Sequence, residues 1–107
     1  MYHLSSVYMS LNIKYGFSSK VWRHPAPAGW YFVSLPRAIS KEIREQFKFQ
    51  EQGWGRLKVS AQTGMSTWTT SVWFDTKRQT YLLPMKAEIR IKEKINEGSS
   101  MKITIRI

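Results

Sequence analysis

The chain has 107 residues, 42% of them hydrophobic and 14% aromatic, so it can bury one sizeable core and form one domain. It has no cysteine, which excludes disulfides and thiolate catalysis, and no apolar run of about 18 residues that would span a membrane. Seventeen Lys and Arg against seven Asp and Glu give a net charge of +10, which attracts nucleic acid or other anions. We expect a basic, cytoplasmic, monomeric domain with no membrane partner.

Residues 1–12 show no regular pattern and are predicted to be a loosely ordered leader, followed by a single domain over 13–107. Apolar and polar residues then alternate, which indicates a half-buried strand, and the run 30–35 is apolar throughout, which indicates a strand covered on both faces. Apolar residues at every fourth position after Pro36 indicate a short amphipathic helix. The predicted elements of this half are strands over 13–24 and 30–35, a helix over 39–47 and a strand over 56–63.

The second half repeats this order, with strands over 67–74 and 80–83, a short helix over 86–94 and a strand over 101–107. Leu35-Pro36 is matched by Leu83-Pro84, and the Glu-Ile-Arg triplet at 42–44 is matched at 88–90. We interpret this as an internal repeat of strand, strand, helix and strand. The predicted fold is mainly β, a small six-stranded barrel with two short helices, since closure removes exposed sheet edges.

Alternation also assigns the two faces of the strands. The residues expected to point inward are Leu57, Val59, Trp68, Val72, Phe74, Ile103 and Ile105. Those expected to point outward are Lys58, Trp73, Lys102 and Arg106. We assign Trp30, Trp54 and Trp68 to the core or to loop packing.

The combination of Trp30-Tyr-Phe-Val-Ser-Leu-Pro36, Gly53-Trp-Gly55, Thr67-Trp-Thr-Thr-Ser71 and Tyr81-Leu-Leu-Pro-Met-Lys-Ala87 resembles a family of small bacterial domains of unknown function. The resemblance covers about residues 13–107. It implies a double-split β-barrel related to the swapped-hairpin barrels of AbrB- and MazE-like DNA-binding proteins, and fusions to bacteriocin-protection or OmpD-associated domains. The chain departs from the family in having Gly98-Ser99 where relatives have Gly-Asp. The family brings no catalytic residues with it.

Enzyme chemistry is poorly supported by the residues available, and we expect no catalytic residue, metal or cofactor. Five of the seven carboxylates lie on or just after the predicted helices beside Lys or Arg, and Asp75 opens a turn, which leaves Glu51. A catalytic pair of carboxylates would need two such residues. His24 adjoins a proline-rich loop, and His and Asp are too few for a metal cluster.

A noncatalytic binding module for nucleic acid or a small anionic ligand is the better hypothesis, because basic and aromatic residues alternate on the outward faces. The candidate contacts are Trp22, Arg56, Lys58, Trp73, Lys86 and Arg90. Lys86 and Arg90 would lie one helical turn apart, with Lys94 a turn later, as a basic stripe. Two alternatives stay open: a protein-interaction module, and a small enzyme. The indoles could equally be covered by the helices.

Overall fold

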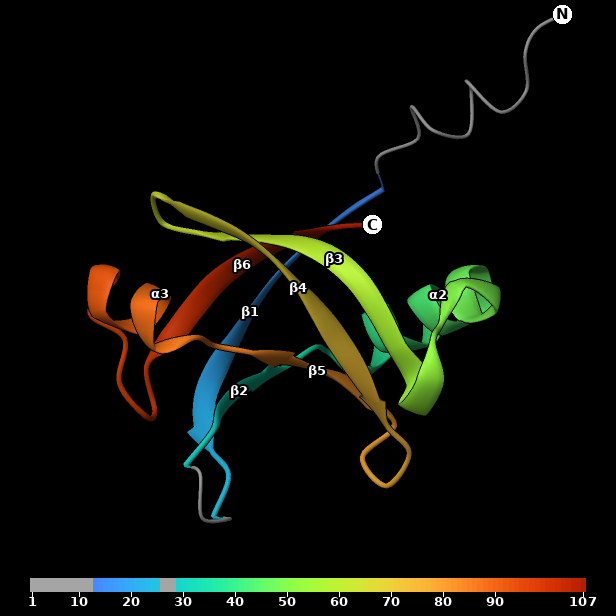
Figure 1. Cartoon of the computed structure of the whole chain (residues 1–107), viewed down its shortest axis with the longest axis horizontal. Helices are drawn as coiled ribbons and strands as arrows, with labels where there is room; N and C mark the ends of the chain where they lie inside the picture. The colour runs from blue at the N-terminus through green and yellow to red at the C-terminus, as the bar shows by residue number, and fades with distance from the viewer. Residues whose placement is uncertain (1–12, 26–28) are drawn as a thin grey trace, which may run out of the picture.

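Six antiparallel strands close into one barrel, in the order β1-β2-β5-β4-β3-β6 (Figure 1). The structure, a computed structural model, describes residues 13–25 and 29–107, without the side chain of Trp54, so the predicted leader lies outside the described residues. The strands are β1 (Lys14–Arg23), β2 (Tyr31–Ser34), β3 (Arg56–Thr63), β4 (Ser66–Asp75), β5 (Thr80–Pro84) and β6 (Ser100–Arg106). The predicted fold class is therefore confirmed, and the barrel closes within one chain.

Two helices follow β2 and β5, and they lie on opposite sides of the barrel (Figure 1). They are α2 (Arg37–Phe47), continued by the 3-10 turn η1 (Lys48–Gln50), and α3 (Ala87–Lys92); a second 3-10 turn, η2 (Gly53–Gly55), precedes β3. Helix α3 is shorter than predicted because Lys94 takes a positive φ of 55° and ends it. None of the described helices has the length and apolar composition needed to cross a membrane.

The core fills the barrel with the side chains that alternation assigned inward. Of the seven predicted core residues, six are buried and Phe74 is partly buried against them. Trp68 belongs to this core, as expected, and is 7% exposed. Ser40 is also buried, where its Oγ accepts the N–H of Tyr81 at 3.0 Å and so ties α2 to β5. Burial of alternate residues on β1, β3, β4 and β6 confirms the predicted register of these strands.

The two halves of the chain are equivalent in topology. Exchanging β1, β2 and β3 for β4, β5 and β6 leaves the strand order of the barrel unchanged. Two backbone hydrogen bonds fix the equivalence, from Leu35 N–H to the carbonyl of Tyr81 and from Met85 N–H to the carbonyl of Tyr31. Tyr31 thus corresponds to Tyr81, and the alignment of the two Leu-Pro pairs predicted from the sequence is wrong by two residues.

Candidate nucleic-acid interface

Five aromatic rings gather on the outer face of β1, β2 and β4, and we call this group the aromatic surface. Its members are Trp22, His24, Trp30, Phe32 and Trp73. Phe32 lies at the centre, with ring centroids 5.2 Å from Trp22, 6.1 Å from Trp30 and 6.5 Å from Trp73. Trp30 and Trp73 are also neighbours, with centroids 6.0 Å apart. The structure therefore joins the two predicted outward indoles through Phe32.

The rings differ in exposure: Phe32 is buried beneath the surface, whereas the indoles of Trp30 and Trp73 are accessible to a ligand. Phe32 is 5% exposed, whereas Trp30 is 49% and Trp73 is 37% exposed. Trp22 is half-buried, and its indole Nε1–H donates to Ser34 Oγ at 3.0 Å, which fixes the ring. The indoles of Trp30 and Trp73, both packed against Phe32, therefore offer flat apolar rings to a ligand.

Local sequence explains how Trp30 reaches this surface. Gly29 has a φ of +60°, in the left-handed region that favours glycine, just before β2. The N–H of His24 bonds to the carbonyl of Trp30 at 2.7 Å, so the ends of β1 and β2 stay joined. Trp30 therefore extends the outer face from the segment before β2, and of the two places expected for it, the core is wrong. The side chain of Trp54 lies outside the described residues.

Two guanidinium groups adjoin the indoles. The Arg78 guanidinium lies over the ring of Trp22 at 4.9 Å, and it forms an ion pair with Asp75. Asp75 also accepts the backbone N–H groups of Lys77 and Arg78, as its predicted role in the turn requires. Partial burial opposes ionisation, but the bonds from Arg78 and Lys77 outweigh it and lower the pKa of Asp75. A charged Asp75 thus holds Arg78 at the aromatic surface.

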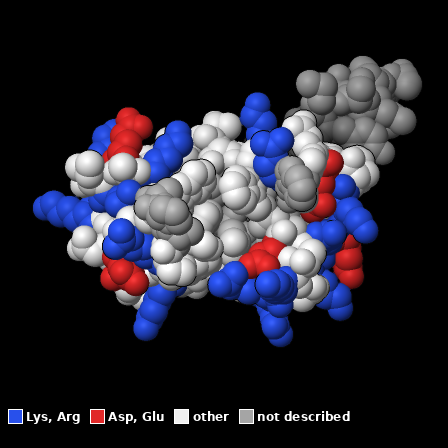
Figure 2. Space-filling model, turned by 60° about the horizontal axis from the view of Figure 1, so that its bottom comes forward, with Lys and Arg blue, Asp and Glu red and all other residues white. Residues whose placement is uncertain are grey.

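Arg56 lies directly opposite Trp73 in the β3–β4 ladder. Its Nε donates to the carbonyl of Gly53 at 3.2 Å, which orients an otherwise exposed guanidinium. Lys58 follows on the same outer face, opposite Ser71, and is exposed. Both predicted cations thus continue the aromatic surface along β3. Figure 2 shows Lys and Arg side chains around a central area of uncharged residues on this side of the molecule.

Lys86 and Arg90 flank a pocket of about 240 Å³ that Trp30 and Tyr31 also line. Lys86 is exposed, but the Arg90 guanidinium lies 3.8 Å from the centroid of Tyr31 and its Nε donates to Met85 O at 3.1 Å. Arg90 is therefore held by the protein, and the predicted stripe does not reach Lys94, because α3 ends before it. Lys86 is the better contact of the two.

Sequence reasoning missed Trp30 and Arg78, and it placed His24 on the polar face of the first strand without naming it as a contact. The alternation rule covers strands, whereas Trp30 and Arg78 lie before a strand or in a turn. Arg78 follows the predicted turn residue Asp75, and that spacing was the one signal that could have placed it.

Glu51, the one carboxylate for which the sequence analysis found no role, contacts Tyr81 and Arg44. It accepts the hydroxyl of Tyr81, and the Arg44 guanidinium is 3.9 Å away. Burial, together with the neighbouring Glu51 carboxylate, raises the pKa of the Tyr81 hydroxyl. In the described part of the chain, no three His, Asp or Glu side chains gather as a metal site.

The comparisons with known proteins give one family. A family model described as a domain of unknown function, DUF1905, matches residues 17–105. No curated protein matches the chain significantly. The match spans all six strands almost completely, so the barrel and the aromatic surface both lie within it.

Proposed function

The chain belongs to the DUF1905 family, and we propose that it is a noncatalytic module that binds single-stranded nucleic acid on the aromatic surface. The observation that carries this proposal is the pair of exposed indoles, Trp30 and Trp73, with the oriented Arg56 beside Trp73. Aromatic faces stack unpaired bases, and guanidinium groups neutralise the phosphates between them. Both kinds of group occur here within one outer face.

A single strand fits better than a duplex. Stacking on an indole needs a free base face, which base pairing in a duplex hides. The described helices are 11 and 6 residues long, and no ring of the aromatic surface lies on either of them, so this surface presents no helix to a major groove. We therefore expect little sequence preference.

The charge of the chain supports an anionic ligand. A net charge of +10 on 107 residues attracts a phosphate backbone over long range and makes binding dependent on salt. The resemblance to AbrB- and MazE-like proteins, which bind DNA, favours the same ligand class. The monomeric state, the cytoplasmic location and the fusions to other domains stay predictions.

Noncatalytic action is supported by the position of Glu51. Its carboxylate accepts the Tyr81 hydroxyl and lies beside Arg44, so it serves to hold the segment before β3 onto the barrel. General acid–base catalysis would need this group turned toward a substrate. Measuring hydrolysis of a generic phosphodiester with wild type and Glu51→Gln would reveal an activity if this reasoning is wrong.

The second candidate is a protein-interaction module, and the partly apolar aromatic surface favours it specifically, because exposed Trp and Phe mark protein interfaces. The dependence of binding on salt concentration distinguishes a nucleic-acid ligand from a protein partner. Binding to a phosphate backbone weakens steeply as salt rises, whereas apolar docking does not.

The test is a titration of a fluorescently labelled oligothymidylate with the protein at two salt concentrations, followed by anisotropy. We expect weak binding, with a Kd of about 10⁻⁴ to 10⁻⁶ M at physiological salt. Competition by a mononucleotide at equal phosphate concentration would move the proposal toward a small anionic ligand. Binding that ignores salt would contradict it and favour a protein partner.

A further inference from the structure

A second hollow, larger than the pocket beside Trp30, lies between α2 and the turn that joins β4 to β5. We call it the α2 groove; its volume is about 450 Å³. The residues that line it are Arg37, Lys41, Arg44, Glu45, Phe74, Thr76 and Gln79.

The cations of the α2 groove come from one stripe of the helix. Arg37, Lys41 and Arg44 are spaced four and three residues apart, so they lie on the same face of α2. Like charges at this spacing repel each other. Within the described residues, Glu51 lies near Arg44, but neither Arg37 nor Lys41 forms an ion pair. Three cations against the one carboxylate of Glu45 thus leave the groove with a net positive charge.

Two of these cations are oriented by the protein. Arg37 Nε donates to the carbonyl of Arg78 at 3.3 Å, which fixes its position beside the turn. The Arg44 guanidinium lies over the ring of Phe74, 3.9 Å from its centroid, and the Arg44 side chain is 29% exposed. A planar guanidinium supported in this way can stack with a base or bind a phosphate with two hydrogen bonds.

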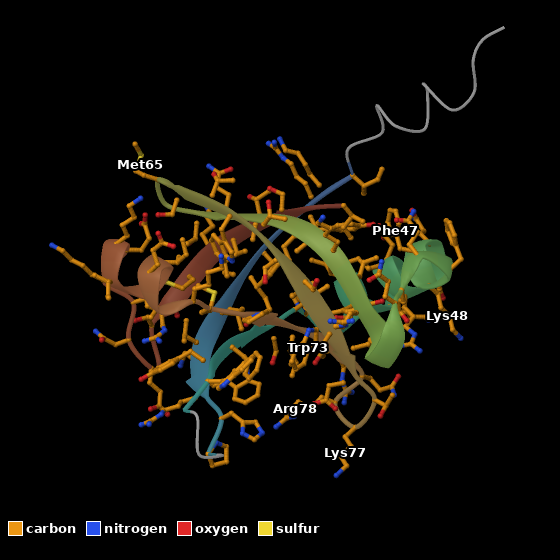
Figure 3. All side chains as sticks on the ribbon, in the orientation of Figure 1. Phe47, Lys48, Met65, Trp73, Lys77 and Arg78 are labelled. Carbon is orange, nitrogen blue, oxygen red and sulfur yellow. The ribbon has the colours of Figure 1, made fainter. Side chains whose placement is uncertain are left out.

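The α2 groove is continuous with the aromatic surface. Arg78 joins them, since its carbonyl accepts the bond from Arg37 while its guanidinium lies over Trp22. Figure 3 shows Trp73, Lys77 and Arg78 on one side of the molecule, where β4 leads into the turn.

We infer that the α2 groove is a second contact site for the phosphodiester backbone of a single strand whose bases stack on the aromatic surface. This inference rests on the proposed function. A strand leaving Trp22 passes Arg78 and meets Arg37 and Lys41, whose unpaired charges neutralise its next phosphates. Only a strand longer than the aromatic surface can reach the groove, so its contribution depends on length.

The test is therefore a length series. Oligothymidylates of about 4 and about 12 nucleotides cover the range of strand lengths that one small barrel binds. The variant is Arg37→Ala/Lys41→Ala. The matched control is Lys92→Ala/Lys102→Ala, which removes the same charge from exposed positions on α3 and β6.

For the long strand, we expect the groove variant to flatten the slope of log K against log salt by about 1.4, because each single-strand phosphate contact contributes about 0.7. For the short strand, its slope should equal that of the control. Lys41→Ala alone should give about half the effect on the long strand. The Lys41 side chain makes no hydrogen bond or ion pair within the described residues, so this substitution leaves the bond from Arg37 to the β4–β5 turn intact.

Equal slopes for the variant and the control with the long strand would overturn the inference, as would the same loss with both lengths. Either result would leave the proposed function standing. If neither oligonucleotide binds the wild type, the proposed function fails and the inference fails with it.

Discussion

Trp22 and Trp73 occupy equivalent positions in the two halves of the barrel, and both face outward. In β1–β2, Trp22 lies opposite Phe32, next to the Arg23–Tyr31 pair; in β4–β5, Trp73 lies opposite Leu82, next to the Phe74–Tyr81 pair. The pairing of β2 with β5 brings the two halves together at Val33 and Leu83. The internal repeat thus places two copies of one outward indole on a single surface.

Replacing Trp73 by Ala removes the stacking face beside Arg56 without opening the core, since Trp73 lies on the outer face. Stacking of one base contributes about 1–3 kcal/mol, so we expect oligothymidylate binding to weaken about 5- to 150-fold. Anisotropy titration measures the change. Met65→Ala is the control, because Met65 is 96% exposed at the tip of the β3–β4 hairpin, away from this surface (Figure 3). Equal effects of the two substitutions would exclude Trp73 as a contact.

Lys86→Ala and Arg90→Ala should differ, although the sequence grouped the two residues. Lys86 is exposed, so its loss should flatten the salt slope by about 0.7 and leave stability unchanged. Arg90 packs on Tyr31 and bonds to Met85 O, so its loss should lower the free energy of unfolding by about 1–3 kcal/mol. Salt-dependent titration and urea unfolding separate the two effects. A stable Arg90→Ala with a flattened slope would show that Arg90 contacts phosphate.

Ile105→Ala tests the core. Ile105 is fully buried and lies between Tyr15 of β1 and Ala61 of β3, so truncation should cost about 2–5 kcal/mol of unfolding free energy. Arg106→Ala, at the adjacent outward position, should change it by less than about 0.5 kcal/mol. Chemical denaturation of both variants checks the register; a reversed ranking would mean that β6 is shifted by one residue.

Gly64→Ala tests the β3–β4 turn. Gly64 has a φ of +55°, and an added Cβ would lie 2.0 Å from an oxygen of Glu93, which itself accepts the hydroxyl of Ser66. We expect a loss of more than about 1 kcal/mol in unfolding free energy. Gly16→Ala is the control, because nothing lies within 4 Å of the added Cβ there. Thermal unfolding compares them, and a Gly64→Ala as stable as Gly16→Ala would contradict the turn geometry.

The Tyr81–Glu51 contact predicts a loss of stability at alkaline pH. Burial and the Glu51 carboxylate raise the pKa of Tyr81 in the folded state above its ordinary value of about 10. Above pH 10 the unfolded chain therefore releases a proton that the folded chain retains, and the unfolding free energy falls as pH rises. It should fall less steeply for Tyr81→Phe. Urea unfolding between about pH 9 and 11 measures both slopes, and parallel curves would mean that Tyr81 titrates normally.

The barrel could be predicted from the sequence because its signals are local. Alternation placed Leu57, Val59 and Ile105 inside and Lys58 outside, and the repeat indicated that both halves share one order of elements. The ends of the helices and strands were harder to predict, because they depend on the backbone conformation of single residues. Lys94 ends α3 through a left-handed backbone conformation that its residue type does not favour.

The candidate site could be predicted only in part. Trp22, Arg56 and Trp73 followed from the outward positions of strands, and the structure brings them to one surface. Trp30 lies outside the strand that follows it, and its contacts depend on the bend at Gly29. The α2 groove depends on how α2 packs beside the β4–β5 turn, a long-range contact that no local pattern encodes.

The most direct test of the central claim is the anisotropy titration of a labelled oligothymidylate of about 12 nucleotides, with wild type and Trp73→Ala, at about 50 and 200 mM salt. If the aromatic surface binds a single strand through three to five phosphates, log K should fall against log salt with a slope of about −2 to −3.5. Trp73→Ala should then bind more weakly at both salt concentrations with the same slope, because stacking is lost and the phosphate contacts stay. No binding at 50 mM salt, or equal binding by the two proteins, would contradict the account.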